Sequence, residues 1–411
     1  MTISTCNGNA YTYLRETNEI IGNLVDNTSF AWNFSPLQQF ESFPNLDTFI
    51  LSITETCNLR CTYCCYSGNY HNNRSHSTSL ISEEDIDEVL MFIQLHITKP
   101  KFYIAFYGGE PLTNFQVLEY AILKARKLWG DNVELSVSTN AVLLTPERID
   151  WFVEQNVRLD ISIDGGKSIH DKHRVTANGQ GSFNLVYSAL RYIHDTYPEY
   201  MKEHVLKLMT IDSLTDVRKA AEEWSKDDLL SEIEPSKISS LAPNFSKSVP
   251  RYEYDELVAK YIELLNEYEA HMDWKVLKVF FEQCVTYWLH RPVLEVEESV
   301  PMATCLPLNN KLYIDTKKRI SVCEKFCDSY HIGNVAEGID WHAANSLVQD
   351  YYQKRFERCK YCPAVRMCNL CLTAVEHNDS EWDVLCNNEQ VLTKVNFRIF
   401  CEMAERGLLQ L

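Results

Sequence analysis

The cysteines are the residues of this sequence whose type and spacing most directly suggest chemistry. The chain has 15 cysteines among 411 residues, and two groups of them are closely spaced. The first group is Cys57, Cys61 and Cys64, which directly follow an apolar segment. Three thiolates on one tight loop can ligate three irons of a 4Fe–4S cluster and leave the fourth iron free for an external ligand. The alternative is a structural or zinc-binding role, but zinc would want a fourth ligand nearby, and the side chain of Cys65 points away from that of Cys64.

A second cysteine group lies near the C-terminal end of the sequence. Its seven members are Cys305, Cys323, Cys359, Cys362, Cys368, Cys371 and Cys386. Two C-x-x-C pairs within it are separated by five residues, too few for the usual zinc ribbon. The N-terminal residues show no signal peptide, and a cytoplasmic chain keeps its thiols reduced. Reduced, clustered thiols usually indicate metal.

Composition and charge exclude several classes of protein. Hydrophobic residues make up 45% of the chain and charged residues 23%, which excludes a disordered or fibrous protein. The net charge of −18 repels phosphate backbones and anionic lipid, which argues against a nucleic-acid-binding protein. No apolar run reaches the roughly 20 residues that span a bilayer. We therefore expect a cytoplasmic protein of two or three domains that binds neither nucleic acid nor membrane.

Strand and helix patterns alternate in the first half of the chain. Short apolar segments predict strands at residues 48–54, 102–108, 133–139, 158–164 and 204–210. Apolar spacing predicts helices at residues 83–97, 115–129, 146–156 and 181–197. The first helix follows Ser82, a residue suited to the N-cap position. This alternation predicts βαβ units and a parallel sheet, either open or closed into a barrel.

The remaining segments differ from this core in composition. A hairpin pattern, Tyr11–Leu14 and Glu19–Gly22, lies in the polar N-terminal segment. We expect a linker over residues 236–250, followed by helices over 252–272 and 274–289. The chain beyond Pro301 is expected to be turn-rich, with a final helix over 388–407. The predicted organisation is an N-terminal segment at 1–47, a strand–helix core at 48–235, a helical bridge at 236–300 and a cysteine-rich domain at 301–411.

The first cysteine group resembles the signature of the radical S-adenosylmethionine (SAM) superfamily, C-x-x-x-C-x-aromatic-C, with Tyr63 as the aromatic residue. One strand–helix unit later comes Gly108-Gly109-Glu110. Two glycines let a backbone approach a ligand closely, and a carboxylate can pair with an ammonium group. This segment is similar to the one that binds the methionine amino group of SAM in that superfamily. The resemblance implies a 4Fe–4S cluster on the three cysteines, with SAM on its free iron.

Polar residues at two further strand ends fit the same resemblance. They are Ser136, Ser138, Thr139, Asn140, Ser162 and Asp164. The family has a Thr-Asn-Gly sequence that contacts the ribose and carboxylate of SAM, and Ala141 replaces its glycine here. These residues lie at C-terminal strand ends, where (β/α) barrels carry their chemistry. For His170, His173 and Arg174, which follow closely, we expect surface or capping roles.

The C-terminal cysteines resemble the SPASM extension of radical SAM enzymes, which holds two auxiliary 4Fe–4S clusters. The resemblance assigns the distal cluster to Cys359, Cys362, Cys368 and Cys386, and the proximal cluster to Cys305, Cys323 and Cys371. The fourth proximal ligand is either Cys327 or a substrate thiolate on an open iron, and we favour the open iron. The sequence departs from the family in the short spacing between Cys368 and Cys371 and in having Lys318 where a glycine is usual. The remaining thiols, Cys6, Cys65, Cys284 and Cys401, are expected to be buried and structural.

The implied fold is α/β, a partial (β/α)6 radical SAM barrel with a C-terminal cysteine-rich SPASM domain. Residues 64–76 resemble peptide maturases of the type that acts on Cys-x-x-x repeats and forms thioethers (ranthipeptides). The resemblance implies an enzyme that uses SAM and three 4Fe–4S clusters to generate a 5′-deoxyadenosyl radical. Its product would be a bond from a cysteine sulfur to a side-chain carbon in a ribosomally made precursor peptide. The implied partners are a precursor peptide with a leader and a flavodoxin- or ferredoxin-type electron donor.

Several alternatives stay open. Sulfatase maturation, in which a Cys or Ser becomes formylglycine, and peptide epimerisation share every cluster motif. A non-catalytic iron–sulfur or zinc protein is more remote, because it would not need a SAM pocket. The N-terminal hairpin resembles part of a leader-recognition element, and a plain hairpin is the alternative. Asp315 and Tyr313, which lie between two proximal ligands, are weak catalytic candidates, with a hairpin role as the alternative.

Overall fold

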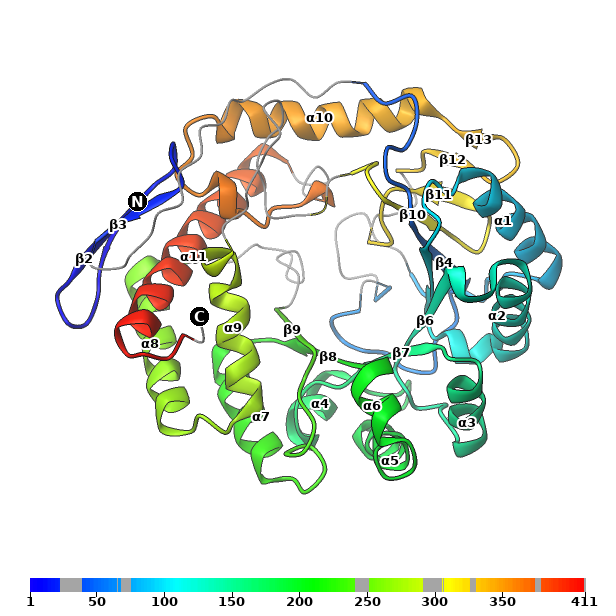
Figure 1. The fold of residues 1–411 in the computed structure, drawn as a ribbon, viewed down its shortest axis with the longest axis horizontal. Helices are drawn as coiled ribbons and strands as arrows, with labels where there is room; N and C mark the ends of the chain where they lie inside the picture. The colour runs from blue at the N-terminus through cyan, green and yellow to red at the C-terminus, as the bar shows by residue number, and fades with distance from the viewer. Residues whose placement is uncertain are drawn as a thin grey trace.

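A curved sheet of ten strands forms the framework of the protein (Figure 1). The computed structural model describes residues 1–22, 39–64, 66–67, 75–240, 251–290, 305, 307–325, 330–373 and 378–409. Six neighbouring parallel strands form the partial barrel: β4 (Thr48–Thr54), β5 (Phe102–Gly108), β6 (Val133–Thr139), β7 (Arg158–Ser162), β8 (Val205–Ile211) and β9 (Lys237–Ser240). The predicted α/β fold with a partial (β/α)6 barrel is confirmed.

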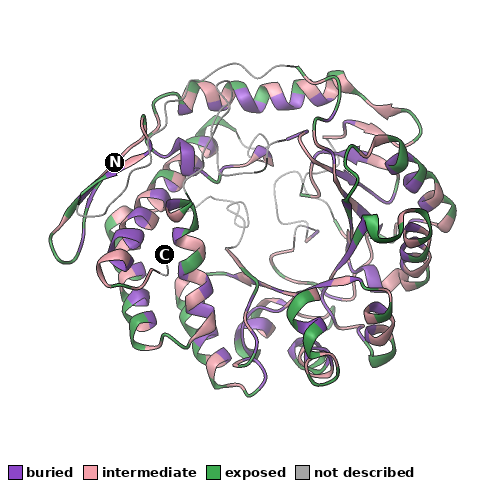
Figure 2. Cartoon of the chain, in the orientation of Figure 1, coloured by how far each residue is buried: buried purple, intermediate pink, exposed green. Residues whose placement is uncertain are grey.

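Helices cover the outer side of these strands (Figure 1). They are α1 (Glu83–His96), α2 (Phe115–Trp129), α3 (Pro146–Glu154), α4 (Lys167–His173), α5 (Phe183–Thr196), α6 (Pro198–His204) and α7 (Leu214–Lys226). Ser82 caps α1 as predicted, because its side chain accepts from the backbone N–H of Asp85 in a capping box. Figure 2 shows buried residues along the strands and on the inward faces of the helices.

The sixth barrel strand corrects the predicted organisation. β9 occupies residues 237–240 and pairs in parallel with β8, so the predicted linker over 236–250 begins with a strand and the boundary at 235 falls inside the barrel. The strand has only four residues, Lys-Ile-Ser-Ser, and lacks the apolar run by which the other strands were predicted. Residues 241–250 lie outside the described part of the chain.

The C-terminal segment extends the same sheet. Its strands are β10 (Lys311–Ile314), β11 (Arg319–Ser321), β12 (Gly333–Asn334) and β13 (Gly338–Ile339). β10 pairs in parallel with β4, with Lys311 opposite Thr48 and Ile314 opposite Leu51. The cysteine-rich segment is therefore hydrogen-bonded to the barrel and does not form a separate sheet.

Four further helices complete the ring of secondary structure: α8 (Tyr254–Ala270), α9 (Lys275–Leu289), α10 (Trp341–Cys359) and α11 (Asp379–Glu405). The first two agree with the predicted helical bridge. Helix α10 contradicts the expectation of a turn-rich region, and α11 begins at Asp379 rather than at residue 388. No helix in the described ranges is long and apolar enough to cross a membrane.

The N-terminal residues form a separate three-stranded sheet in the order β1 (Thr2–Ser4), β2 (Ala10–Leu14) and β3 (Glu19–Ile21). The predicted hairpin is confirmed as β2 and β3, and β1 adds a third strand. The ring of Tyr13 packs edge-on against Trp288 of α9, with centroids 5.0 Å apart, and also contacts Phe397 of α11. This small sheet is thus anchored by aromatic packing to the C-terminal half of the protein.

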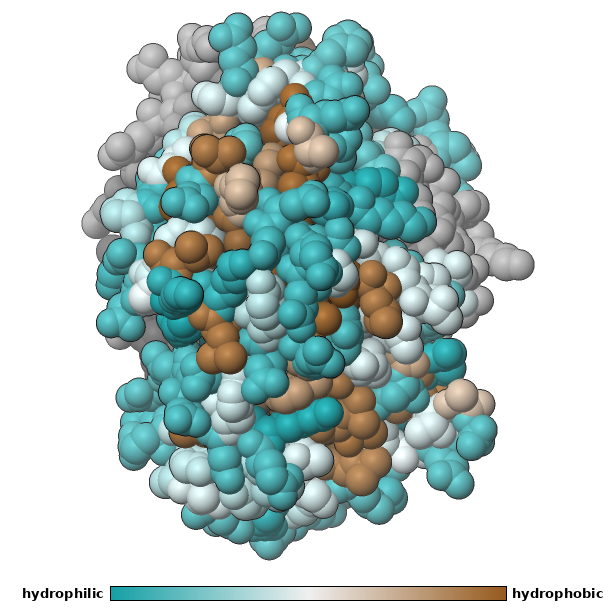
Figure 3. Space-filling view, turned by 90° about the vertical axis from the view of Figure 1, so that its right-hand side faces the viewer, coloured by the Kyte–Doolittle hydropathy of each residue, from teal (hydrophilic) through white to brown (hydrophobic). Residues whose placement is uncertain are grey.

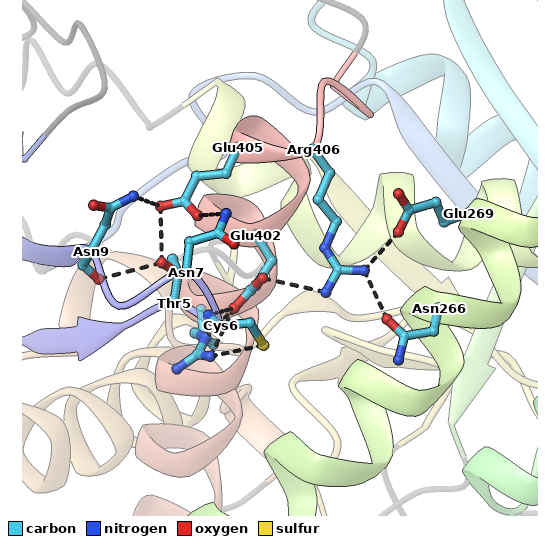
Figure 4. A network of polar contacts seen from close by, with 10 residues as sticks. Thr5, Cys6, Asn7, Asn9, Asn266, Glu269, Glu402, Glu405 and Arg406 are labelled. Carbon is cyan, nitrogen blue, oxygen red and sulfur yellow. Dashed lines mark hydrogen bonds and ion pairs between the residues drawn. The ribbon is translucent and has the colours of Figure 1, made fainter.

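Polar contacts fix the same sheet to the end of α11 (Figure 4). The carboxylate of Glu405 accepts hydrogen bonds from Thr5 Oγ1 at 2.9 Å, Asn7 Nδ2 at 2.8 Å, Asn9 Nδ2 at 2.9 Å and the Tyr11 hydroxyl at 2.8 Å. Three of these donors meet Oε1 and one meets Oε2, so four hydrogen bonds converge on a single carboxylate. One side chain near the C-terminus therefore ties down the loop between β1 and β2.

The outer face formed by α1 and α2 is shown in Figure 3. Its exposed apolar side chains include Met91 and Leu95 on α1 and Leu123 and Leu128 on α2. On this face the view shows apolar groups interrupted by hydrophilic side chains. Scattered exposed apolar residues are normal for a protein surface, so we assign no docking role to this face.

Candidate active site and auxiliary cysteine sites

The first cysteine group lies on the loop that follows β4, at the C-terminal edge of the parallel strands. The backbone N–H of Leu59 donates to Cys57 Sγ at 3.4 Å, and that of Tyr66 donates to Cys64 Sγ at 3.4 Å. Cys61 lies between them in sequence, and all three thiols are partly exposed. N–H donors directed at sulfur stabilise thiolates and tune a bound cluster. The loop therefore has the donor set that an iron–sulfur cluster requires.

The end of β5 holds this loop through its two glycines. Gly109 N–H donates to Thr54 O at 2.7 Å, and Glu110 N–H donates to Thr56 O at 2.9 Å. A Cβ atom at Gly108 would lie 2.1 Å from Thr54 O, and one at Gly109 would lie 2.3 Å from Thr56 O. The two glycines therefore let β5 approach the backbone that carries the cysteines, and the predicted close approach to a ligand stays a prediction.

Glu110 lies fully buried beside the loop. Its carboxylate accepts from Leu112 N–H at 3.1 Å, from the Thr139 hydroxyl at 2.7 Å and from Asn140 N–H at 2.7 Å. Burial raises the pKa of Glu110 to about 7, although these three donors oppose the shift. Three of about four acceptor positions are occupied, so one position is left for a cationic ligand group.

The end of β6 joins Glu110 to the cysteine loop. Asn140 Nδ2 donates to Asn58 Oδ1 at 2.8 Å and lies 3.8 Å from Cys57 Sγ. Ala141, which stands where the family has glycine, has φ of 60°, a left-handed conformation that glycine adopts without strain. The substitution therefore keeps the backbone geometry at the cost of local strain.

The predicted serines lie on β6 and β7. Ser136 is buried, whereas Ser138 and Ser162 are half-buried. Ser138 stands opposite Asp160 of β7 in the strand register. Ser136, Ser138 and Asn140 alternate along β6 and its end, so they share one face of the strand.

Asp164, just after β7, connects the cysteine loop to the far side of the barrel. It accepts from Arg174 Nε at 2.7 Å and from Thr210 N–H at 2.8 Å, and the Tyr63 hydroxyl also donates to it. Burial raises the pKa of Tyr63 well above its usual value, so this hydroxyl stays protonated as a donor. The aromatic residue of the cysteine signature is thus hydrogen-bonded to a buried ion pair.

A ring of hydrogen bonds closes behind this ion pair. Asp164 N–H donates to His170 Nδ1 at 3.2 Å, which assigns the proton of the neutral imidazole to Nε2. His170 Nε2 lies 2.9 Å from Ser182 Oγ, and the Ser182 hydroxyl donates to Arg174 O at 2.8 Å. We name the set Asp164, His170, Ser182 and Arg174 the β7 ring. It fixes the orientation of Arg174, which is also within electrostatic range of Cys61.

These contacts bear on the surface or capping roles that were expected of three residues. Arg174 is the C-cap residue of α4, in keeping with a capping role. His170 is 0% exposed and Arg174 is 8% exposed, so neither is a surface residue. The His173 ring lies 2.6 Å from the Thr62 hydroxyl on the cysteine loop. Only one feature of the sequence indicates that these three residues belong to the site: they follow the strand end that carries Asp164.

The distal cysteines line one cavity of about 280 Å³ between α10, α11 and the segment that joins them. Cys359, Cys362, Cys368 and Cys386 all contribute to its walls. The guanidinium of Arg355 also lines it, and Arg355 Nη1 lies 3.7 Å from Cys368 Sγ. Sequence reasoning missed this arginine, because α10 was not predicted.

Three proximal cysteines line a second, smaller cavity of about 30 Å³. They are Cys305, Cys323 and Cys371, as the resemblance implied, and Cys371 Sγ lies 2.9 Å from the Thr373 hydroxyl. Lys311 of β10 also lines the cavity, 4.0 Å from Cys323 Sγ and 3.1 Å from Glu324 Oε2. Cys327, the predicted alternative ligand, and Cys65 lie outside the described residues.

The weak catalytic candidates have the contacts of hairpin residues. Asp315 accepts from the backbone N–H groups of Lys317 and Arg319 at 2.9 Å each, and it pairs with the Arg319 guanidinium at 2.7 Å. Tyr313 is 1% exposed within β10. Lys318 in the same turn has φ of 60°, so it adopts the left-handed conformation of the glycine that it replaces.

The remaining described thiols line neither cysteine cavity. Cys401 is buried and Cys284 is half-buried, in keeping with structural roles, but Cys6 is exposed rather than buried. Among the described residues, no three Cys, His, Asp or Glu side chains converge as they would around a single metal ion. In a cubane each thiolate binds a different iron, so its cysteines need not converge on one point.

The Arg355 side chain supports the fit of a cluster to the distal cavity. Its Nε and Nη2 atoms are buried and have no hydrogen-bond partner in the described part of the chain. An unpaired buried charge is costly. Four thiolates holding an iron–sulfur cluster form an anionic group that would supply the missing partner, so these residues fit the implied cluster.

Comparison with known proteins decides the fold family. Residues 51–222 match the family model of the Radical SAM superfamily. The protein has a radical SAM fold. The matched residues begin within β4, contain the first cysteine group and Glu110, and end within α7.

Relatives in this superfamily include maturation enzymes. The chain is 31% identical over 159 residues to a cysteine-type anaerobic sulfatase-maturating enzyme of Clostridium novyi, which is 38% of this chain and 42% of that enzyme. It is 23% identical over 357 residues to the radical SAM cyclopropyl synthase TigE of Paramaledivibacter caminithermalis, covering 83% of this chain and 71% of TigE. The first of these alignments therefore spans less than half of the relative's length.

Solved structures share the fold over most of the chain. The structure of anSMEcpe with bound AdoMet and Cp18Cys peptide has a TM-score of 0.63 and 19% identity, and the match covers 89% of this chain and 98% of that one. Streptococcus suis SuiB bound to the precursor peptide SuiA has a TM-score of 0.51 and 12% identity, with 83% and 74% coverage. At these identities the likeness concerns the fold.

Proposed function

We propose that this protein is a radical SAM peptide maturase that installs thioether cross-links in a ribosomally made precursor peptide. The observation that carries the radical SAM part of the proposal is the hydrogen-bonded connection of Cys57, Glu110 and Asp164 at the C-terminal edge of the parallel strands. The thioether chemistry rests on the resemblance of residues 64–76 to peptide maturases. Asn140 connects Glu110 to the cysteine loop, and Tyr63 connects Asp164 to it. A loop with three thiols and a buried carboxylate with one free acceptor position match what SAM on an iron–sulfur cluster requires.

In this proposal each part of the site has a defined task. Cys57, Cys61 and Cys64 hold the first cluster, and the open acceptor position of Glu110 binds the ammonium group of SAM. Cluster and SAM, when bound, supply the 5′-deoxyadenosyl radical that abstracts hydrogen from the peptide. The β7 ring keeps the cysteine loop in place through Tyr63.

The proximal cavity is proposed to serve the sulfur chemistry. Cys305, Cys323 and Cys371 hold an auxiliary cluster there, whose remaining iron is open to the substrate thiolate, with Cys327 as the alternative ligand. The distal cavity holds the third cluster and contributes to electron transfer. Loss of two hydrogens is a two-electron oxidation of the peptide. One hydrogen atom would pass to the 5′-deoxyadenosyl radical and the thiol would release a proton, so one electron remains that an auxiliary cluster, when bound, could accept.

Two partners follow from this proposal. The N-terminal sheet offers an edge to which the leader of the precursor peptide can add as an extended strand. A flavodoxin- or ferredoxin-type protein would supply the electron that reduces the first cluster.

SAM cleavage tests the first part of the proposal. Anaerobic reconstitution should yield three clusters, and dithionite should then produce 5′-deoxyadenosine. Replacement of Cys57, Cys61 or Cys64 by Ala should abolish this cleavage, whereas Cys284→Ala, outside both cysteine groups, should retain it. Iron far below three clusters, or cleavage that survives loss of Cys57, would contradict the assignment.

Cross-linking tests the second part. Incubation with a cysteine-rich precursor peptide should give a product that has lost two hydrogens per cross-link and resists thiol alkylation. Cys371→Ala should keep part of the SAM cleavage and lose the cross-link. If the two activities fall equally in Cys371→Ala, the C-terminal cysteines have a structural role.

Sulfatase maturation is the second candidate, favoured by the similarity to the Clostridium novyi enzyme. A peptide carrying a sulfatase-type Cys or Ser would then gain an aldehyde that reacts with a hydrazide probe. Peptide epimerisation would leave the mass unchanged in ordinary water and add deuterium in heavy water. The same incubations therefore separate the three reactions.

A further inference from the structure

Arg355 of α10 places a positive charge inside the distal cavity. The side chain is 1% exposed and lines the cavity together with the four distal cysteines. Its Nη1 donates to Leu370 O at 2.8 Å and lies 3.7 Å from Cys368 Sγ. A guanidinium keeps its charge at any ordinary pH, so this charge is buried whether or not the cavity is filled.

No acidic side chain in the described part of the chain forms an ion pair with this charge. Nε and Nη2 of Arg355 are buried and lack a hydrogen-bond partner in the described ranges, and no carboxylate there lies within ion-pair distance. Glu389 lines the same cavity and lies within electrostatic range of Arg355, but it forms no ion pair with it, and its carboxylate accepts from the backbone N–H of Asn369 at 3.0 Å. The packing of Tyr351 against the guanidinium, at 5.6 Å, supplies contact but no countercharge.

A second arginine of the same cavity shows the opposite arrangement. Arg358 lies one helical turn further along α10, and its side chain is 30% exposed. It pairs with Asp379 at 3.5 Å and with Asp383. The two arginines therefore share a helix and a cavity, and differ in whether an acidic side chain forms an ion pair with them.

We propose that Arg355 is the countercharge of the distal auxiliary cluster and raises its reduction potential. This inference rests on the distal cluster of the proposed function. A one-electron reduction adds a negative charge to the cluster, with the electron coming from the reductant and no bond made or broken. A fixed positive charge a few ångströms away stabilises the more negative, reduced state. The unpaired Nε and Nη2 atoms give it two further donors toward the cysteine sulfurs or the cluster.

A redox titration of the reconstituted full-length enzyme tests this inference. The titration uses a triple variant, Cys57→Ala/Cys61→Ala/Cys64→Ala, so that the first cluster does not contribute to the spectra. Adding Cys359→Ala to this variant removes the signal of the distal cluster and so identifies it. In Arg355→Gln, the reduced-to-oxidised ratio of that cluster at a fixed solution potential should fall about tenfold, a midpoint lower by about 59 mV. Arg355→Lys retains the charge and should shift the ratio by less than about threefold.

Arg358→Gln is the matched control, because its charge is already neutralised by acidic neighbours. It should change the ratio by less than about twofold. Equal shifts in Arg355→Gln and Arg358→Gln, or an unchanged midpoint in Arg355→Gln, would overturn the inference. If Arg355→Gln does not retain the distal cluster, Arg355→Lys tests the inference instead. Retention of the cluster in Arg355→Lys supports a countercharge, and its loss refutes one.

Iron analysis separates this inference from the proposed function. If Cys359→Ala removes no iron, the distal assignment is wrong and the inference falls with it. If Cys359→Ala removes about four irons per chain and the Arg355 variants leave the midpoint unchanged, the assignment stands and the inference alone is refuted.

Discussion

Replacement of His170 by Gln tests whether the β7 ring depends on a neutral imidazole. Burial, and then the charge of Arg174, lower the pKa of His170 from 6.5 to about 4. The unfolded chain takes up a proton below about pH 6.5, whereas the folded chain takes it up only near pH 4. The contribution of His170 to the free energy of unfolding is therefore fully present above pH 6.5 and is lost as the pH falls toward 4. A shift of 2.5 units at about 1.4 kcal/mol per unit gives a loss of about 3 kcal/mol, of which about 2 kcal/mol is lost by pH 5.

Urea unfolding followed by tryptophan fluorescence under anaerobic conditions measures this effect. We expect the wild-type advantage over His170→Gln to shrink by about 2 kcal/mol between pH 7.5 and pH 5, because only the wild type carries this titrating group. His194→Gln is the control, since its ring forms surface contacts to Asp195 and Glu232, and we expect less than a third of that change. A difference between wild type and His170→Gln that is constant with pH would refute the reasoning, because His170 would then not be held neutral.

Three further predictions concern contacts around the same sites. Gly109→Ala should lose iron from the first cysteine group, because the added Cβ would lie 2.3 Å from Thr56 O. Gly179→Ala is the control and should retain that iron, because no atom lies within 4 Å of its added Cβ. Equal iron contents in the two variants would contradict this prediction. The affinity for SAM, measured by equilibrium dialysis, should rise between pH 6 and pH 8 as Glu110, with a pKa of about 7, ionises. Glu110→Gln should bind more weakly and show no such rise, and a rise that persists would exclude Glu110 as the ammonium partner. Glu405→Gln should destabilise the N-terminal sheet by about 1–3 kcal/mol. Limited proteolysis should then cleave residues 1–21 faster than in the wild type. An unchanged cleavage rate would argue against Glu405 as the anchor of this sheet.

The barrel was largely predictable because its apolar strands and cap signals are local. Segments such as Thr48–Thr54 combine an apolar run with flanking polar residues, and the structure places that strand at the predicted residues. The strand at Lys237–Ser240 was missed because its extended conformation depends on pairing with β8, a contact between segments distant in sequence. Helix α10 was missed because its polar residues obscure a buried stripe that includes Leu347, Tyr351 and Arg355.

The candidate site was predictable where motifs carry it and unpredictable where tertiary contacts do. The spacing of Cys57 and its neighbours and the position of Glu110 are visible in the sequence. The partners of Asp164 are not, because His170 and Arg174 resemble ordinary surface residues until the turn after β7 folds back on them. Likewise, Lys311 and Glu324 come together only through the β10–β11 hairpin. Their one sequence signal was that Glu324 directly follows a predicted ligand.

The pairing of β10 with β4 has a consequence for the peptide substrate of the proposed function. Cys57 follows the C-terminal end of β4, whereas the proximal cavity adjoins Lys311, which stands opposite Thr48 at the other end of that strand. Seven residues of strand correspond to about 20 Å, and no hinge lies between the two ends. Closure of one domain over another therefore cannot shorten this distance. In the proposed function, a peptide that reached both sites at once would need about six extended residues. Its sulfur must therefore leave the proximal site and meet the activated carbon before the bond forms.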